Sequence, residues 1–125
     1  MASKKVLIVE DNLPVLVSYL QILETLNLDI TPFVAATYEG AQKIFLQEKI
    51  DLIILDLVLP DALATSVLAD IRRIQPDVSV LLVTGYPEQV DEEAVEQHRV
   101  RHVFKKPLEV DSFARVVRSS LNALN

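Results

Sequence analysis

The chain has no cysteine, no tryptophan and only two glycines in 125 residues. The absence of cysteine excludes a disulfide framework, a cysteine–zinc cluster and a thiol nucleophile. No apolar run approaches the roughly 20 residues that a membrane helix needs. The run "VLIV" near the start is also too short for the core of a signal peptide. We therefore expect a soluble, cytoplasmic protein that does not associate with membranes.

Basic residues are the minority among the charged ones. The chain has 12 lysines and arginines against 18 aspartates and glutamates, and its formal net charge is −6. Nonspecific binding to nucleic acid needs a basic surface that displaces counterions from the phosphates. Direct binding to nucleic acid is therefore not expected.

The composition is that of one folded domain. Half of the residues are apolar, which is too many for a disordered chain. A chain of this length has the common size of a single domain and buries enough surface for a real core. The sequence contains no internal repeat, low-complexity tract or linker, so we expect residues 1–125 to form one domain.

Short apolar runs alternate with longer segments of helical spacing. The runs predict strands at 5–9, 30–36, 52–55, 78–83 and 102–105. The segments between and after them predict helices at 14–26, 38–49, 65–75, 87–97 and 111–124. This alternation predicts an α/β fold, in which right-handed crossovers build a doubly wound, five-stranded parallel sheet with helices on both faces.

Local signals support these boundaries. Asn12 and Thr37 stand where helix caps are expected, and Pro76 stops the third helix. Pro32 lacks a ladder donor, which favours an edge position for the second strand. The segment 87–97 is acidic and a poor helix former. The last helix presents one apolar face, made by Phe113, Val116, Val117, Leu121 and Leu124.

Polar side chains stand where the predicted strands end: Glu10, Asp11, Asp56, Thr84, which Gly85 follows, Lys105 and Lys106. In an open parallel sheet, ligands bind outside the carboxyl ends of the strands, so we expect these residues to meet at one edge. Asp56 follows "DLIIL" and precedes "LVLP", and an unpaired carboxylate in such apolar company is costly. Its place at the rim of the sheet resolves this conflict.

The combination of residue types constrains the chemistry of this edge. Carboxylates that gather repel one another unless a cation intervenes. Ligands that offer only oxygen favour a hard divalent ion such as Mg²⁺. A lysine and a threonine hydroxyl opposite the acids suit an incoming phosphoryl group, and a carboxylate can itself be the nucleophile. The pattern therefore predicts phosphoryl transfer to an aspartate.

The chain resembles the receiver domain of bacterial two-component response regulators over almost its full length. The matching pieces, in order, are "LIVED" (7–11), "LIILDLVLP" (52–60), "LLVTG" (81–85) and "KKP" (105–107). The resemblance implies a flavodoxin-like sheet with strand order 2-1-3-4-5. It also implies a signalling switch rather than a metabolic enzyme, phosphorylated by a partner histidine kinase or phosphotransfer protein.

The resemblance also implies the role of each site residue. Glu10 and Asp11 would form the acidic pair that binds Mg²⁺, with Asp11 the more direct ligand. Asp56 would be the phosphoacceptor and a further metal ligand. The backbone carbonyl of Val58 would complete the metal shell.

The resemblance implies that two more residues would contact the incoming phosphoryl group. Thr84 would bind a phosphoryl oxygen. Lys106, next to the proline, would pair with the phosphoryl group, although Lys105 is its neighbour in the sequence.

The chain departs from the family at two places. The family usually has a glycine five to eight residues beyond the acceptor, where this chain has residues 62–65, "ALAT". It also usually has an aromatic residue three positions before the lysine, where this chain has Val103. Phe104 is one position off, and a shift of one residue turns a strand side chain to the other face.

These departures change the expected behaviour of the site. We expect the loop after Asp56 to fold differently from that of the family. We expect the switch to use residues 85–104, with Tyr86 and Phe104 as reporters. The first helix has a wide apolar face, which predicts a contact surface for a second copy of the chain or for a downstream protein.

Three alternatives remain for the function. A flavodoxin-like cofactor carrier would need a phosphate-cradling loop after the first strand, where this chain has "EDNLPV". An aspartate-nucleophile phosphatase would need an acid two residues beyond the nucleophile, where Val58 stands. The third alternative is a degenerate receiver that binds partners without phosphate.

Overall fold

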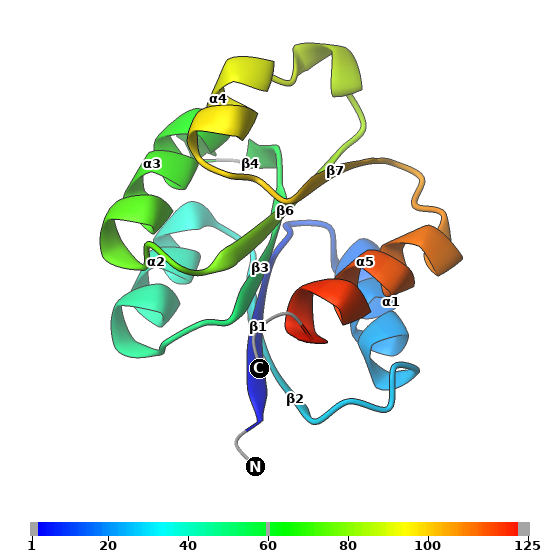
Figure 1. Ribbon diagram of the computed structural model, residues 1–125. Coiled ribbons are helices and arrows are strands. Elements are labelled where there is room, and N and C mark those ends of the chain that lie inside the picture. Colours follow the sequence, from blue (N-terminus) through cyan, green and yellow to red (C-terminus); the bar gives the residue numbers. More distant parts are fainter. Residues whose placement is uncertain (1–2, 60, 123–125) are drawn as a thin grey trace.

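The strands form one parallel sheet. A computed structural model describes residues 3–59 and 61–122, and within them a five-stranded sheet has the order β2-β1-β3-β6-β7 (Figure 1). Its strands are β1 (Lys4–Val9), β2 (Ile30–Ala35), β3 (Leu52–Asp56), β6 (Ser79–Thr84) and β7 (His102–Lys105). Every pairing in this sheet is parallel. The predicted fold class and the strand order 2-1-3-4-5 are confirmed.

Helices cover both faces of the sheet. The helices are α1 (Leu13–Glu24), α2 (Tyr38–Gln47), α3 (Ala64–Ile74), α4 (Glu92–Gln97) and α5 (Val110–Asn122). In Figure 1, α1 and α5 lie on one side of the sheet, and α2, α3 and α4 lie on the other. In the described part of the chain, no helix combines the length and the apolar character that crossing a membrane would require.

The predicted caps begin their helices. The side chain of Asn12 accepts a hydrogen bond from the Val15 N–H at 3.1 Å, at the start of α1. The hydroxyl of Thr37 accepts one from the Gly40 N–H at 3.1 Å, at the start of α2. Each cap satisfies an N–H group that a helix start leaves without a partner.

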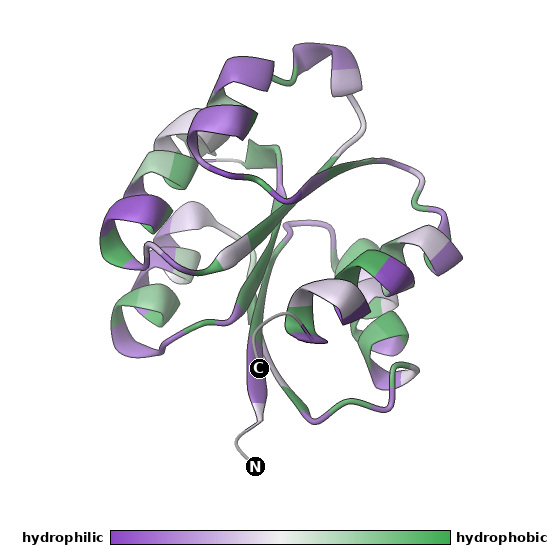
Figure 2. Ribbon diagram, viewed as in Figure 1, coloured by the Kyte–Doolittle hydropathy of each residue, from purple (hydrophilic) through white to green (hydrophobic). Residues whose placement is uncertain are grey.

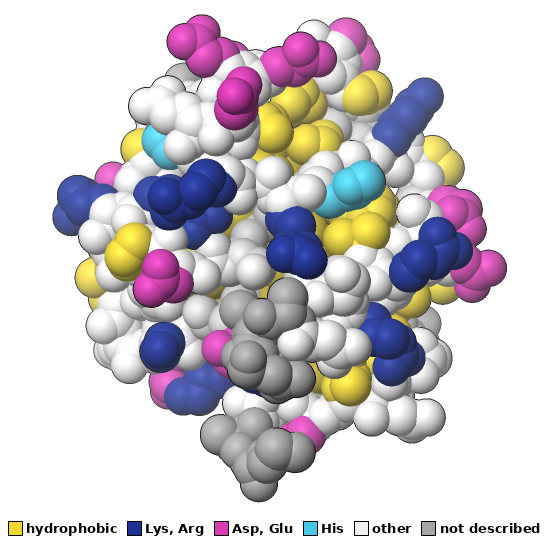
Figure 3. Space-filling model, in the orientation of Figure 1, with side chains coloured by type: hydrophobic (Ala, Val, Ile, Leu, Met, Phe, Trp, Pro, Cys, Tyr) yellow, Lys and Arg dark blue, Asp and Glu magenta, His cyan; other side chains and the backbone are white. Residues whose placement is uncertain are grey.

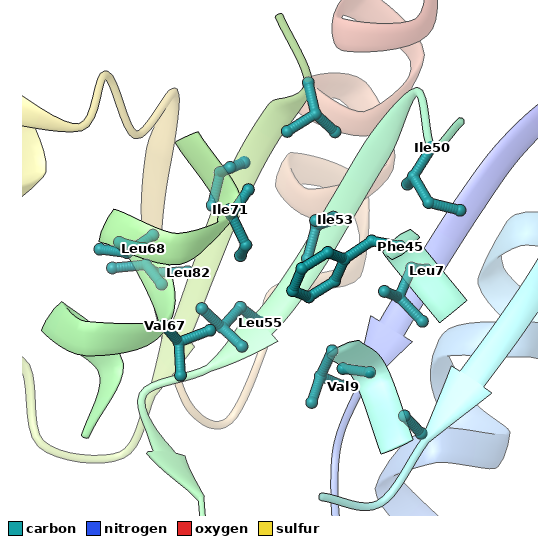
Figure 4. Packing of buried hydrophobic residues seen from close by; sticks show 14 of the residues in the cluster. Leu7, Val9, Phe45, Ile50, Ile53, Leu55, Val67, Leu68, Ile71 and Leu82 are labelled. Atoms are coloured by element: carbon teal, nitrogen blue, oxygen red, sulfur yellow. The ribbon is translucent and has the colours of Figure 1, made fainter. Parts of the chain in front are cut away.

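Alternate residues of each strand enter two separate cores. On β1, Leu7 and Val9 pack with α2 and α3, whereas Val6 and Ile8 pack with α1 and α5. Figure 4 shows the first of these cores, where Phe45 of α2 lies over the strands. Figure 2 shows the same pattern as hydrophobic colour along the strands and mixed colour along the helices. Burial on both faces is why the strands read as continuous apolar runs.

The structure corrects the predicted helix at 87–97. A 3₁₀ turn, η1 (Pro87–Gln89), comes first, Val90 is extended, and α4 starts only at Glu92. The carboxylate of Asp91 caps α4 by accepting from the N–H groups of Glu93 and Ala94 at 3.0 and 3.2 Å. Asp is a strong capping residue, so a new helix begins there instead of the first one continuing.

A short hairpin follows β3 that the sequence patterns did not predict. Strands β4 (Val58–Leu59) and β5 (Ala62–Leu63) pair antiparallel beside Asp56. This hairpin occupies the loop in which the usual glycine is absent. At the other end of the chain, Leu124, assigned above to the apolar face of the last helix, lies outside the described residues.

Candidate functional site

Three carboxylates meet where β1 and β3 end. Glu10 follows β1 directly, and its N–H donates to the Ala35 carbonyl at 3.0 Å. Asp56 is the last residue of β3. Glu10, Asp11 and Asp56 each offer an oxygen within 4.8 Å of the others. Glu10 and Asp56 are buried and Asp11 is exposed, so the cluster reaches from the edge of the core to the surface.

One ammonium group joins the two buried carboxylates. The Nζ of Lys106 donates to Oε1 of Glu10 at 2.9 Å and to Oδ2 of Asp56 at 2.8 Å. The backbone N–H of Lys106 donates to the Thr84 carbonyl at 2.7 Å, which extends the pairing of β6 with β7 and fixes where the side chain starts. The neighbouring Lys105 is exposed and makes no ion pair with another described residue.

Burial and the hydrogen bonds between Lys106 and the carboxylates shift the pKa values of Glu10 and Lys106 in opposite directions. Burial raises the pKa of Glu10 above its usual range, and the hydrogen bond from Lys106 offsets only part of that rise. Burial by itself would lower the pKa of Lys106, but hydrogen bonds to Asp56 and Glu10 outweigh it and leave that pKa raised. The interaction with one lysine therefore does not fully offset the free-energy cost of burying the charged carboxylates.

Backbone groups orient the remaining carboxylate oxygens. Oδ1 of Asp56 accepts from the Val58 N–H at 2.9 Å, and Oε2 of Glu10 accepts from the Asn12 N–H at 3.2 Å. Each carboxylate is thus held at both oxygens, one by Lys106 and one by the chain two residues ahead. The side chain of Asp11 has no such partner among the described residues and remains open to solvent.

The acidic cluster faces a hollow of about 480 Å³, here called the acidic pocket. Its lining residues are Glu10, Asp11, Asn12, Val15, Asp56, Val58, Gly85, Tyr86 and Lys106. The Val58 side chain is 53% exposed at this rim. Tyr86 is also 53% exposed, which places it at the mouth of the pocket.

Thr84 lies beside the acidic pocket without lining it. Its side chain is fully buried, and its hydroxyl oxygen accepts from the Tyr86 N–H at 2.9 Å. Asp56 of β3 is in register with Val83 of β6. Thr84, the next residue of β6, therefore lies close to Asp56. Contact with a group in the pocket would require its hydroxyl to turn outward.

The aromatic residue of β7 points away from the acidic pocket. Phe104 is only 6% exposed, and its ring meets Phe113 of α5 edge to face at a centroid distance of 5.1 Å. Val103 packs into the opposite core, with α2 and α3. The expected consequence of the one-residue shift is confirmed: the two residues lie on different faces of the sheet.

Sequence patterns missed two residues, one beside the acidic cluster and one in the hairpin that follows Asp56. Tyr19 of α1 is 2% exposed, and its hydroxyl is a buried side-chain atom without a partner in the described structure. Burial, and then the charges of Glu10 and Asp56, raise the pKa of this phenol. Asp61 accepts from the N–H groups of Tyr38 and Glu39 at 2.9 and 3.1 Å, which ties the hairpin to α2. Neither role has a local signal, because both depend on the packing of α1 and α2.

A comparison with known families agrees with this geometry. The family model of the response regulator receiver domain matches residues 6–118 of this chain. The chain belongs to this family. It is thus a receiver domain of the two-component type, and the resemblance found in its four short motifs is confirmed.

Individual relatives support the same family and fold. The transcriptional regulatory protein CitT of Bacillus subtilis (strain 168) is 29% identical over 83 residues, a match that covers 66% of this chain and 37% of CitT. A CheY-like receiver domain protein of Methanospirillum hungatei JF-1 superposes with a TM-score of 0.87 at 24% identity, covering 98% of this chain and 96% of that one.

A third relative carries a metal. The receiver domain of sensor histidine kinase PA1611 of Pseudomonas aeruginosa PAO1 has a TM-score of 0.81 at 22% identity, covering 97% of this chain and 99% of that one. That protein coordinates a magnesium ion in its active site cleft. At this level of identity the likeness shows a shared fold.

Proposed function

We propose that this receiver domain is a phosphorylation-dependent signalling switch that accepts a phosphoryl group on Asp56. The observation that carries the proposal is the double contact of Lys106 with the buried Glu10 and Asp56, all three of which line the acidic pocket. A metabolic enzyme would need a substrate pocket with further reactive groups. Here the reactive group is a carboxylate of the chain itself.

We further propose that Mg²⁺ binds to Glu10, Asp11 and Asp56, with the carbonyl of Val58 as an additional ligand. The three carboxylates fit such an ion, since their oxygens converge within 4.8 Å and all donors are hard oxygens. When bound, Mg²⁺ would neutralise charge on the phosphoryl oxygens. The exposed Asp11 would be the ligand most accessible from solvent.

The transfer itself needs little beyond positioning. A carboxylate oxygen of Asp56 attacks phosphorus, an acyl phosphate bond forms, and the bond from phosphorus to the donor breaks. The donor's leaving atom keeps the electron pair and takes up a proton. The ammonium of Lys106, now 2.8 Å from Asp56, would pair with the phosphoryl oxygens, and the Thr84 hydroxyl would turn to donate to one of them.

The proposed donor is a partner histidine kinase or phosphotransfer protein, which makes this domain one step of a phosphorelay. We propose that the domain acts in the cytoplasm and that residues 1–125 form one receiver domain. The proposed output is altered binding of a downstream protein or a second copy of the chain. Support for a moving element comes from α4, a helix of six residues in which Ala94 is buried and most others are exposed.

The proposal is tested by intact-mass measurement after incubation with acetyl phosphate and Mg²⁺. The wild-type chain should gain the mass of one phosphoryl group, and Asp56→Asn should gain none. Asp29→Asn is the matched control, since Asp29 is an exposed aspartate outside the acidic pocket, and it should label like the wild type. Equal labelling of Asp56→Asn would refute the assignment, and a wild type that never labels would leave a phosphate-independent binding module.

A further inference from the structure

A second charged hollow lies at the opposite edge of the sheet, where β6 and β7 begin. Three arginines line it: Arg72 of α3, and Arg99 and Arg101 of the connection between α4 and β7. The hollow has a volume of about 340 Å³, and its other lining residues are Pro76, Asp77, Val78 and Ser79. Figure 3 shows acidic side chains at the upper end of the molecule and basic side chains spread over the face below them. We call this feature the arginine hollow.

Arg72 fixes a positive charge at the base of the arginine hollow. Its Nε donates to the His98 carbonyl at 2.6 Å and its Nη2 to the Arg99 carbonyl at 3.1 Å. Its Nη1 donates to the carbonyls of Pro76 and Val78 at 3.0 and 2.5 Å. All of these partners are neutral carbonyl groups. The guanidinium is therefore held rigidly, but its charge is not cancelled by a direct contact.

Arg99 occupies a backbone position that favours glycine. Its φ of 56° lies in the left-handed region. The next N–H, that of Val100, donates back to the Val95 carbonyl at 2.9 Å, the pattern that closes a helix at a C-terminal glycine. A side chain with a β-carbon costs energy in this conformation. The Arg99 side chain compensates with one contact, since its Nη2 donates to the Pro76 carbonyl at 2.7 Å across the arginine hollow.

Among the described residues, no carboxylate forms a direct ion pair with these arginines. The ion pairs found among the described residues involve Lys5, Lys43, Arg73 and Lys106 as cations. Asp77 is the acid that lines the arginine hollow, and it makes none of those ion pairs. Three positive charges thus face one negative charge in a protein whose net charge is −6.

We propose that the arginine hollow binds a small molecule through a phosphate group. Arg99 already donates to the Pro76 carbonyl at 2.7 Å and Arg101 to the Ser119 hydroxyl at 3.4 Å. Their other N–H groups would hold the phosphate, because the planar guanidinium fork matches phosphate oxygens. The Ser79 hydroxyl, which lines the same hollow, would donate a further hydrogen bond. Arg72 would supply fixed charge without moving. A concave volume of about 340 Å³ is at the lower end of the range for small-molecule sites.

This site is independent of the proposed phosphorylation, and the test keeps the two apart. Inorganic phosphate is added to the full chain without Mg²⁺, at constant ionic strength against chloride, and amide chemical shifts and the melting temperature are followed. Phosphate should shift the amides of 77–80 and 98–101 and raise the melting temperature. Acetate at the same ionic strength should do neither, and an equal response to acetate would refute the assignment to phosphate.

Arg99→Gly gives the sharpest variant because glycine suits the left-handed backbone. Without phosphate, this variant should melt at a higher temperature than the wild type. Its affinity for phosphate should fall at least tenfold, and Arg101→Gln should show a similar loss. Arg115→Gln, an exposed arginine on α5, is the control and should bind phosphate like the wild type. Unchanged affinity in Arg99→Gly and Arg101→Gln, or shifts confined to the acidic pocket, would overturn the proposal.

Discussion

The ammonium of Lys106 lies 2.8 Å from Oδ2 of Asp56, although the two residues are 50 positions apart in the chain. The same ammonium also contacts Glu10. Any change of charge on Asp56 therefore changes how one cation is shared between two acids. Since Lys106 directly follows β7, such a change acts at the carboxyl end of that strand.

Mg²⁺ should stabilise the protein in the absence of phosphate. The ion would relieve repulsion among the three carboxylates, which are within 4.8 Å of one another. Mg²⁺ should raise the melting temperature of the wild type and leave that of Asp11→Ala unchanged. In metal-free buffer Asp11→Ala should be as stable as the wild type or more so. A rise of equal size in both proteins would show that the ion binds elsewhere.

Loss of the Lys106 ammonium should destabilise the fold at neutral pH. Lys106→Met leaves Glu10 and Asp56 buried without their cation, which should cost on the order of 2 kcal/mol in the free energy of unfolding. Lys105→Met is the control, since Lys105 is exposed and its loss should cost little. Urea unfolding at pH 7 measures both. Equal effects of the two substitutions would contradict the central role of Lys106.

Glu10 should make the metal-free protein less stable as pH rises. Its pKa in the folded state is raised above the ordinary value of 4.5, chiefly by burial. Its contribution to stability is therefore complete below about pH 4.5 and is lost as pH rises through the folded pKa. Relative to the wild type, Glu10→Gln should gain stability between pH 5 and pH 7. Unfolding curves in chelator test this, and the exposed Glu39→Gln should show no such trend.

The buried hydroxyl of Tyr19 should cost stability. The ring stacks on Phe113 with centroids 5.6 Å apart, so Tyr19→Phe keeps the packing and removes only the unpaired hydroxyl. The free energy of unfolding should rise by about 1 kcal/mol. The pKa of Tyr19 is raised above 10.0 in the folded state. The stability that depends on the neutral phenol is complete below pH 10 and is lost as pH rises further. The variant should therefore lose less stability than the wild type above pH 10.

The exposed Tyr86→Phe serves as the control for that measurement and should leave stability unchanged. A loss of stability in Tyr19→Phe would mean that the hydroxyl has a partner, such as a buried water molecule.

Occupation of the acidic pocket by a phosphate mimic should alter the segment 85–104. Its helix α4 has little buried apolar surface, and weakly packed segments open at low cost. Amide hydrogen exchange with and without beryllofluoride should show changed protection in 85–104 and no change in α2. Protection confined to residues 10–12 and 56–59 would mean that the site fills without moving α4.

The sequence alone determined which segments form the parallel strands and which residues belong to the acidic cluster. Strands buried on both faces must be continuously apolar, and a parallel sheet brings all carboxyl ends to one edge. Glu10, Asp11 and Asp56 could therefore be assigned to one place without coordinates. The sequence also predicted the caps at Asn12 and Thr37, because a cap is a contact between residues two or three positions apart.

Only the tertiary structure decided which groups touch. The resemblance assigned Lys106, but its double contact with Glu10 and Asp56 depends on where β7 ends beside β6, since the Lys106 N–H donates to the Thr84 carbonyl. The unpaired Tyr19 hydroxyl and the meeting of Arg72 with Arg99 depend on how helices pack over the sheet. Such contacts join residues far apart in the chain, and their positions are fixed by the fit of whole elements. No local pattern in the sequence records that fit.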